Sequence, residues 1–181
     1  MLRWRGRNIY LIGFMATGKS KVGCELARLL TWPFLDSDSM IEHLAGKSIA
    51  KIFENEGEHS FRRIENQVIR QLAQKQQHVV ALGGGAVILP ANWDLVVQSG
   101  LTICLHASPQ VLFQRISKKS HRPLMNKLSP EEMYQKILDL LALREPLYRR
   151  ADLSFESNDL VPSAHVARLI FQQLDKIDVP G

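Results

Sequence analysis

The sequence predicts an α/β fold with three layers, in which helices cover both faces of a parallel sheet of about five strands. Two observations lead to this prediction. Short apolar segments alternate with longer helix-prone segments, and glycines or aspartates follow the first three apolar segments. Parallel strands require helical connections, because the chain must return to the same end of the sheet before the next strand begins. Without an internal repeat or linker, residues 1–181 fit a single domain with one core.

The expected strands and helices follow in order along the chain. Five apolar segments are candidate strands, at residues 8–14, 33–38, 78–85, 101–107 and 151–157. Helices are expected near 19–30, within the polar segment 39–77 and over 162–177. In the last helix, one apolar face is predicted from the spacing of Val166, Leu169, Ile170 and Leu174.

The composition is that of an ordinary globular protein, with 45% hydrophobic and 23% charged residues. No apolar run approaches the ~20 residues that cross a bilayer. The basic start followed by apolar residues is superficially like a secretory signal. Its apolar stretch is short, however, and runs directly into the glycines of 13–18, so cleavage would destroy the first strand. We therefore expect a cytoplasmic protein without a membrane partner.

The net charge of +5, from 23 basic and 18 acidic residues, suits anionic small molecules. Nucleic acid could also suit a basic chain, but interleaved aromatic and basic residues of the RNA-reading kind are missing from the sequence. We therefore expect no nucleic-acid partner. Cys24 and Cys104 lie among apolar neighbours without metal-site spacing, and we expect two buried thiols rather than a disulfide or a ligand pair.

The segment GFMATGKS, residues 13–20, carries the strongest functional signal. Its Gly-x-x-x-x-Gly-Lys-Ser pattern lies between a candidate strand and a candidate helix. Such a turn points several backbone N–H groups at one spot, at the positive end of a helix dipole, where an anion binds. Glycines also serve ordinary tight turns, but the complete pattern predicts a loop that binds a nucleoside triphosphate. Lys19 is expected to neutralise the transferred phosphate, and the Ser20 hydroxyl to ligate Mg²⁺.

Two aspartates, Asp36 and Asp38, follow the second candidate strand. Asp36 is well placed to hold a water of the Mg²⁺ shell, since magnesium keeps several of its waters in proteins. If the strand reaches Asp38, both side chains project to the same side. Asp38 could then share the metal, or it could orient an acceptor hydroxyl and take its proton. The structural alternative is that Asp38 caps the following helix.

Two further segments offer groups that could position an acceptor. Arg62 and Glu65 are spaced i, i+3 on an expected helix and face the same way, although most such pairs are surface ion pairs. The glycines at 83–85 directly follow a core strand, so a ligand could approach their main chain and accept from their N–H groups. A flexible turn would also use glycine.

Residues 116–129 are polar and strongly basic and contain a proline, which is typical of a loop. Arg122 lies in this segment and Arg115 directly precedes it. A kinase must keep water away from its nucleotide, and a closing lid that carries an arginine would provide both exclusion and charge stabilisation. A solvated basic loop is the plain alternative. Arg144, on a later helical segment, could equally stabilise a helix end.

Together these segments resemble the shikimate kinase family over nearly the whole chain. The resemblance rests on six motifs in order: GFMATGKS at 13–20, DSD at 36–38, FRRIE at 61–65, GGG at 83–85, RPL at 122–124 and REPLYRRAD at 144–152. Very many nucleotide-hydrolysing proteins share the phosphate loop, whereas the ordered set is highly specific. The resemblance implies a P-loop fold of the nucleoside monophosphate kinase type, with a substrate-binding segment near 39–66 and a lid near 116–129.

The same resemblance implies that the γ-phosphoryl group of ATP is transferred to the 3-hydroxyl of shikimate by a monomer that holds one Mg²⁺ through Ser20 and Asp36. The catalytic residues would be Lys19, Asp38 and Arg122. ATP would be bound by Gly13, Ala16, Thr17, Gly18, Lys19, Ser20, Lys21, Arg115, Arg122 and Pro162, with adenine between Arg115 and Pro162. Shikimate would be bound by Asp38, Arg62, Glu65, Gly83, Gly84, Gly85 and Arg144, with Arg62 and Arg144 on its carboxylate.

Some positions depart from the family pattern. Ala16 and Thr17 stand where another glycine and a small residue are frequent, Lys21 stands where threonine is frequent, and Leu160 replaces an arginine that some relatives carry near adenine. These changes keep the loop lysine and hydroxyl, so we expect activity. Two alternatives stay open at this point. One is another small-molecule kinase of this fold, such as a gluconate kinase. The other is a silent nucleotide-binding module, which would be expected to lack a phosphate-handling residue.

Overall fold

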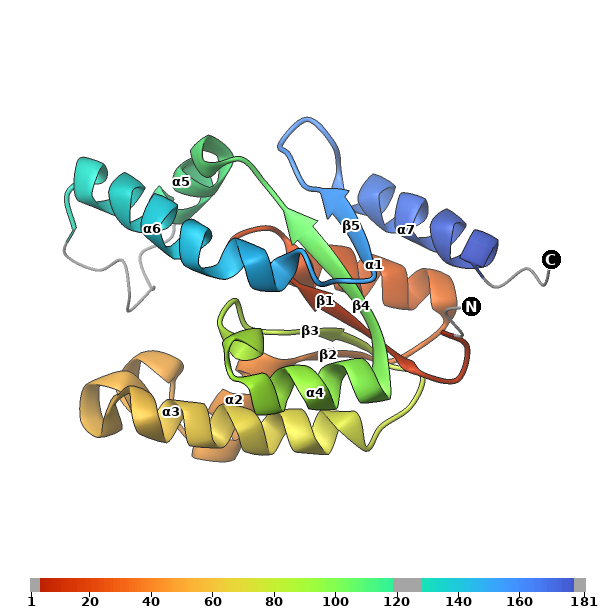
Figure 1. The fold of residues 1–181 in the computed structure, drawn as a ribbon, viewed down its shortest axis with the longest axis horizontal. Helices are drawn as coiled ribbons and strands as arrows, with labels where there is room; N and C mark the ends of the chain where they lie inside the picture. The colour runs from red at the N-terminus through yellow and green to blue at the C-terminus, as the bar shows by residue number, and fades with distance from the viewer. Residues whose placement is uncertain (1–3, 119–127, 178–181) are drawn as a thin grey trace.

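The structure, a computed structural model, describes residues 4–118 and 128–177. Within these residues the centre is a sheet of five parallel strands in the order β2-β3-β1-β4-β5 (Figure 1). The strands are β1 (Asn8–Ile12), β2 (Phe34–Asp36), β3 (Val79–Ala81), β4 (Gly100–His106) and β5 (Leu153–Glu156). The predicted parallel sheet is confirmed, and each strand falls inside a predicted apolar segment except for one extra residue, Gly100.

Helices cover both faces of this sheet, as predicted (Figure 1). They are α1 (Lys19–Leu30), α2 (Ser37–Ala45), α3 (Ile49–Ala73), α4 (Pro90–Ser99), α5 (Pro109–Ser117), α6 (Pro130–Tyr148), α7 (Ser163–Ile177) and the short 3₁₀ helix η1 (Ala86–Ile88). Helices α1 and α7 pack against each other on one face, and α3 and α4 pack against each other on the opposite face. The fold therefore has the three layers expected of it.

Strand β1 shows why both faces need helices. All five of its residues are buried, and successive side chains point to opposite faces of the sheet. Tyr10 and Ile12 pack in the core on the α3 and α4 side, whereas Ile9 and Leu11 pack in the core beneath α1 and α7. A strand that is buried on both sides needs a continuous apolar run, which is the pattern in the sequence.

Helix α7 differs in one detail from its prediction. Val166, Ala167, Ile170 and Leu174 form its buried face, whereas Leu169 is 42% exposed. Each residue advances about 100° around a helix, so Leu169 lies on the far side of Val166 from Ala167 and Ile170. The prediction that Leu169 belongs to the apolar face is therefore wrong.

The end of β2 is also different from the prediction. The strand ends at Asp36 and α2 begins at Ser37, so the expectation that the strand continues to Asp38 is wrong. Asp36, rather than Asp38, is the N-cap: its carboxylate accepts from the backbone N–H of Asp38 at 3.0 Å and of Ser39 at 3.4 Å. Asp38 therefore lies in the first turn of a helix.

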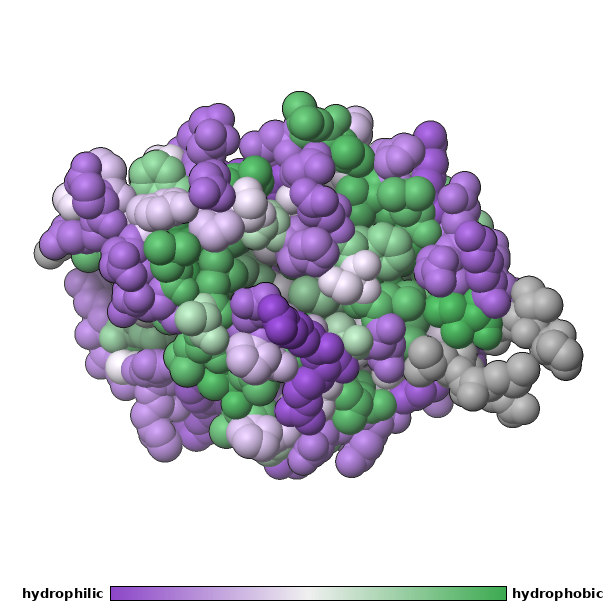
Figure 2. Space-filling model, turned by 45° about the horizontal axis from the view of Figure 1, so that its top comes forward, coloured by the Kyte–Doolittle hydropathy of each residue, from purple (hydrophilic) through white to green (hydrophobic). Residues whose placement is uncertain are grey.

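The cysteine prediction is half right. Cys104 is buried in β4, and burial raises the pKa of its thiol to about 11. Cys24 is exposed, because α1 turns Val22, Gly23, Leu26 and Ala27 toward the core instead. Among the residues described, no helix has both the length and the apolar character that crossing a bilayer requires. On the face shown in Figure 2, hydrophilic side chains cover much of the surface, with hydrophobic ones between them.

Candidate active site

A cleft of about 1350 Å³ lies at the carboxyl ends of the strands. It is lined by most of the predicted site residues, namely Ala16, Gly18, Lys19, Ser20, Lys21, Asp36, Asp38, Arg62, Glu65, Gly83, Gly84, Gly85, Arg115, Arg144 and Pro162. Gly13 and Thr17 do not line it and instead shape the loop beneath. Arg122 lies outside the described residues, as does most of the predicted lid. The cleft has two parts, which we call the phosphate side (residues 13–21 and Asp36) and the acid side (Arg62, Glu65, residues 83–85 and Arg144).

On the phosphate side, glycines shape the loop between β1 and α1. Gly13 has φ +132°, and a β-carbon there would lie 2.1 Å from the carbonyl oxygen of Leu105, so only glycine fits. Gly18 adopts a left-handed conformation (φ 90°) as the N-cap of α1. The Thr17 hydroxyl donates to the Phe14 carbonyl at 2.8 Å, which ties the loop to itself. These residues hold the N-terminus of α1 toward the cleft.

Lys19 is the cation of the phosphate side. It is 9% exposed, and its ammonium group donates to the carbonyl oxygens of Gly13 at 2.9 Å and Phe14 at 2.8 Å. The side chain thus folds back over the loop at the positive end of the α1 dipole. An anion in this loop meets a positive charge that is already held in place.

Ser20 and Asp36 bring two oxygen atoms together beside Lys19. The Ser20 hydroxyl donates to the Asp36 carboxylate at 2.6 Å. The second oxygen of that carboxylate caps α2, which fixes its orientation. A hydroxyl and a carboxylate are the hard oxygen donors that Mg²⁺ prefers, and a site with few protein ligands suits an ion that retains waters and binds phosphate.

Each of the three glycines after β3 makes room for a different neighbour. A β-carbon at Gly83 would lie 2.5 Å from a carboxylate oxygen of Asp38, and one at Gly85 would lie 2.9 Å from Nη1 of Arg62. At Gly84 it would lie 3.0 Å from the backbone nitrogen of Met15, in the phosphate loop. The Gly83 N–H donates to the Ser37 hydroxyl at 2.9 Å, so this turn is fastened to α2. The glycines thus let Asp38, Arg62 and the phosphate loop converge.

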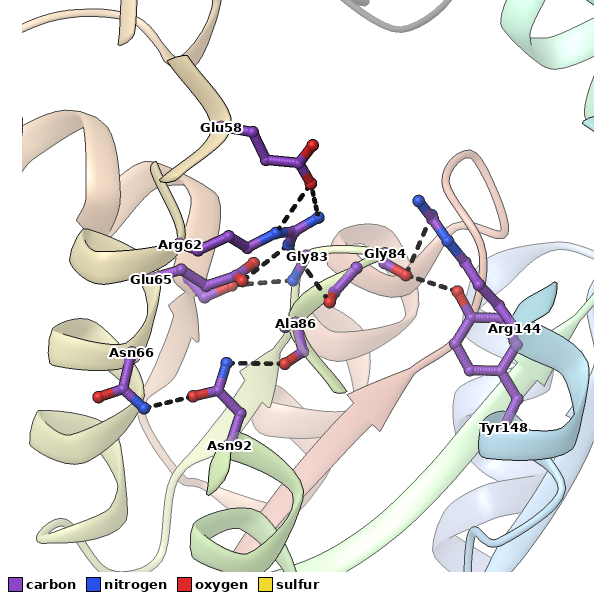
Figure 3. Close-up of polar contacts among 12 residues, drawn as sticks. Glu58, Arg62, Glu65, Asn66, Gly83, Gly84, Ala86, Asn92, Arg144 and Tyr148 are labelled. Carbon is purple, nitrogen blue, oxygen red and sulfur yellow. Dashed lines mark hydrogen bonds and ion pairs between the residues drawn. The ribbon is translucent and has the colours of Figure 1, made fainter. Parts of the chain in front are cut away.

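Arg62 reaches the acid side from α3. Its Nη1 donates to Glu65 at 2.8 Å and to the Gly85 carbonyl at 3.3 Å, while Nε and Nη2 donate to Glu58 at 3.3 and 3.0 Å. Glu58 and Glu65 lie on opposite sides of its guanidinium group (Figure 3). Glu65 is only 1% exposed, and burial raises its pKa, with Asp38 adding to the shift while Arg62 and Arg144 oppose it. The predicted Arg62–Glu65 pair is therefore formed and mostly buried.

Arg144 reaches the acid side from α6, on the other side of the glycine turn (Figure 3). It is 4% exposed, and its Nη1 donates to the Gly84 carbonyl at 3.4 Å. The Tyr148 hydroxyl donates to the same carbonyl. The Nε of Arg144 is buried and has no hydrogen-bond partner among the described residues. A buried cation with an open donor is costly unless a ligand accepts from it.

Arg115 connects the phosphate side to the segment after β5. Its Nη1 donates to the Ala16 carbonyl at 3.0 Å and to the Ser157 hydroxyl at 3.1 Å, and its Nε pairs with Asp159 at 2.8 Å. Pro162 lines the same end of the cleft. Leu160, by contrast, is 91% exposed and does not line it.

Several residues that shape the cleft have roles that were not predicted from the sequence, although Ser37 and Tyr148 lie within the motifs at 36–38 and 144–152. They are Ser37, which holds Gly83; Glu58, which pairs with Arg62; Tyr148, which holds Gly84; and Ser157 and Asp159, which hold Arg115. Glu58 had one available signal, its i, i+4 spacing from Arg62. The others act on partners far away in the chain, and no local pattern reveals them.

Comparison with known proteins agrees with this geometry. The family model described as "Shikimate kinase" matches residues 15–175. A shikimate kinase of Synechococcus sp. (strain JA-3-3Ab) is 40% identical over 173 residues, which cover 95% of this chain and 89% of the relative. The solved structure of a shikimate kinase from Acinetobacter baumannii in complex with shikimate is 37% identical, with a TM-score of 0.91 and 97% of each chain covered.

A gluconokinase from Sinorhizobium meliloti 1021 is a more distant structural neighbour. It is 18% identical, with a TM-score of 0.61 over 97% of this chain and 95% of the neighbour. At this identity the likeness reports the fold alone. The two proteins share the α/β architecture of a parallel sheet between helices.

Proposed function

Because this chain belongs to the shikimate kinase family, we propose how its own residues carry out the family reaction. The reaction is transfer of the γ-phosphoryl group of ATP to the 3-hydroxyl of shikimate, which gives shikimate 3-phosphate and ADP in aromatic amino acid biosynthesis. One observation supports the assignment of the acceptor side most strongly. Arg62 and Arg144, 82 positions apart, both donate to carbonyls of one glycine turn that also touches the phosphate loop.

These two arginines are the proposed ligands of the shikimate carboxylate. Guanidinium groups suit a carboxylate because each can donate two parallel, charge-assisted hydrogen bonds. Arg144 lines the cleft, and its buried Nε has no hydrogen-bond partner among the residues that the structure describes. Glu65 holds Nη1 of Arg62 from its buried position, and the turn at residues 83–85 forms the floor between the two arginines.

Asp38 is the proposed ligand of the acceptor hydroxyl. It stands in the first turn of α2 beside Gly83, between the acid side and the phosphate loop. From there its carboxylate can accept a hydrogen bond from the hydroxyl and keep the oxygen directed at the phosphate. In a loose phosphoryl-transfer transition state the nucleophile is weakly bonded, so this positioning matters more than early removal of the proton.

The phosphate side is the proposed site of the ATP phosphates. Backbone N–H groups of residues 13–20 cradle them, and Lys19 exchanges its loop carbonyls for phosphate oxygens. Ala16, Thr17, Gly18 and Lys21 complete this loop, and Arg115 and Pro162 flank the adenine. Ser20 and Asp36 would hold Mg²⁺, which neutralises charge on the phosphates when bound. Arg122 is proposed to act from the lid at 116–129, and residues 39–66 are proposed to form the substrate-binding segment.

We also propose that the protein works as a monomer in the cytoplasm, where ATP is available. The monomer is supported by the cleft itself, since residues of one chain supply both the phosphate side and the acid side. Size-exclusion chromatography with light scattering would test this, and a dimer at micromolar concentration would contradict it.

A coupled assay of ADP release, with shikimate, gluconate and nucleoside monophosphates as competing acceptors, tests the function. We expect Mg²⁺-dependent turnover with shikimate and only background hydrolysis with the other two. Turnover with gluconate or a nucleotide but not with shikimate would refute the proposed acceptor. Arg62 and Arg144 would then be ligands of a different anion.

A further inference from the structure

The two arginines of the acid side are in opposite states. Four hydrogen bonds engage Arg62: two to Glu58, one to Glu65 and one to the Gly85 carbonyl. A guanidinium group has five N–H donors, and the described residues already engage four of those of Arg62. Arg144 instead has a buried Nε with no hydrogen-bond partner among the described residues. Among the described residues no carboxylate pairs with Arg144, whereas Arg62 is paired with both Glu58 and Glu65, and Glu58 occupies its Nε and Nη2.

Glu58 is the partner of Arg62 that can leave. Its side chain is 63% exposed, whereas that of Glu65 is 2% exposed and fixed beneath the guanidinium group. Glu58 also directly follows Gly57, whose backbone (φ 79°, ψ 176°) interrupts the helical path of α3. Glu58 therefore lies at the start of the second part of α3, where its side chain can turn into solvent.

The contact between Glu58 and Arg62 resembles the contact that the carboxylate of a ligand would make with Arg62. One carboxylate oxygen of Glu58 accepts from both Nε and Nη2 of Arg62, so the edge of the guanidinium group already carries a carboxylate. A second carboxylate arriving at this edge meets occupied donors and a negative charge. Its binding is weakened by the work of displacing the first.

We propose that Glu58 is a positioning residue that occupies Arg62 until the carboxylate of the acceptor displaces it, and so sets the affinity for the acceptor. This inference rests on the proposed function, because it takes the acceptor to be a carboxylic acid bound by Arg62 and Arg144. Arg62 stays in place after the exchange, since Glu65 and the Gly85 carbonyl still hold Nη1. Glu58 opposes binding without taking part in phosphoryl transfer.

The variant Glu58→Gln tests this exchange, because it keeps the length of the side chain and removes the charge. We expect the Kd for shikimate, measured by titration calorimetry without nucleotide, to fall about two- to fivefold, the range for releasing a partly exposed ion pair. In steady-state assays the KM for shikimate should fall in parallel, while kcat and the KM for ATP stay unchanged. If Glu58 had a merely structural role, its replacement would not lower the KM for shikimate while leaving kcat and the KM for ATP unchanged.

Glu54→Gln is the matched control, since Glu54 is an exposed glutamate on the same helix and is not a partner of Arg62. It removes the same charge and should leave the Kd for shikimate unchanged. If Glu58→Gln leaves the Kd unchanged or raises it, or if Glu54→Gln lowers it equally, the exchange is refuted. Failure of the proposed function would look different, because the unaltered protein would then neither bind nor phosphorylate shikimate.

Discussion

The phosphate side and the acid side of the cleft are built in contrasting ways. On the phosphate side, Lys19 donates to carbonyls five and six residues away. The Ser20 hydroxyl donates to Asp36, which ends β2 and is the N-cap of α2. On the acid side, Arg62 and Arg144 come from α3 and α6 and meet only through the turn after β3. The phosphate side is built mainly on one short segment, with Asp36 and Arg115 as contacts from elsewhere, whereas the acid side is an assembly of distant segments.

The difference has an energetic counterpart. The cation of the phosphate side exchanges existing partners for a ligand, so the protein without ligand has little unpaired charge there. On the acid side, Arg144 is desolvated and its Nε has no acceptor among the residues described, which is a cost to the fold. We therefore expect substitutions on the phosphate side to act on catalysis and substitutions on the acid side to act on acceptor affinity and stability.

The largest expected effect tests the phosphate side. Lys19→Met should lower kcat on the order of 10²- to 10³-fold, because the variant loses a pre-positioned charge on the transferring phosphate. The KM for shikimate should change less than about twofold, since the Lys19 ammonium group donates to carbonyls of the phosphate loop. The coupled ADP-release assay measures both constants. A normal kcat would contradict the assignment of the phosphate loop. If the KM for shikimate rose by the same factor as kcat fell, Lys19 would act on acceptor binding as well, and the two sides would not differ in function.

The next effect tests the acid side. Arg144→Met should raise the KM for shikimate about 10²-fold, because a charge-assisted pair with the carboxylate is lost. The same change should leave the melting temperature equal or higher. It removes a buried donor without a partner, Tyr148 still donates to the Gly84 carbonyl, and methionine can pack on the ring of Phe14, which the guanidinium group now covers at 5.6 Å.

Arg150→Met is the control for this prediction. Arg150 is exposed, lies just beyond α6 and stacks on Trp93 at 4.5 Å, away from the glycine turn. It should leave the KM for shikimate unchanged. If Arg144→Met lowers the melting temperature by several degrees and spares the KM, Arg144 is a structural residue and the acid side has been misassigned.

The same contrast explains how much could be predicted from the sequence. The phosphate loop is one contiguous motif, and its lysine, serine and glycines take the places that the motif implies. The centre of the sheet was predictable because β1, β3 and β4 are buried on both faces and are apolar along most of their length. Local rules were less secure at element ends: Asp38 was the cap that the sequence suggested, but β2 ends at Asp36 and Asp36 caps α2.

What the sequence could not reveal is how distant segments satisfy one another. Arg115 is held by Ser157 and Asp159, 42 and 44 positions later, and no local pattern links them. That the Nε of Arg144 is buried without a partner among the described residues is likewise a property of packing, which no local pattern reveals. The role of Glu58 depends on the break in α3 at Gly57, which places Glu58 at the start of a new helical stretch.

A moderate effect is expected from pH, through Glu65. Because burial raises the pKa of Glu65, it takes up a proton at a higher pH than an ordinary glutamate and then no longer holds Arg62 as an ion pair. The KM for shikimate should therefore rise, about five- to tenfold, as the pH falls through this raised pKa. Glu65→Gln should have a raised KM at neutral pH and lack this rise.

Unfolding would not mimic the pH effect. A carboxyl group with a raised pKa in the folded state binds its proton more readily when folded, so its contribution to stability is largest at low pH and declines as the pH rises through that pKa. At pH values below its raised pKa, protonated Glu65 therefore stabilises the folded protein, although the same protonation raises the KM for shikimate. A KM profile that is the same in Glu65→Gln and in the unaltered protein would assign the titration to another group.

The smallest effect concerns strain on the phosphate side. Ala16 has φ +64°, a left-handed conformation that costs a non-glycine residue about 1 kcal/mol. Its carbonyl accepts from Arg115 at 3.0 Å, which holds the residue there. Ala16→Gly removes the strain but makes the unfolded chain more flexible, which costs about 0.5–1 kcal/mol. The free energy of unfolding from urea titrations should therefore change by less than about 1 kcal/mol, with unchanged kcat. A loss of about 2 kcal/mol or more, or a change in kcat, would mean that the alanine methyl group itself supports the loop.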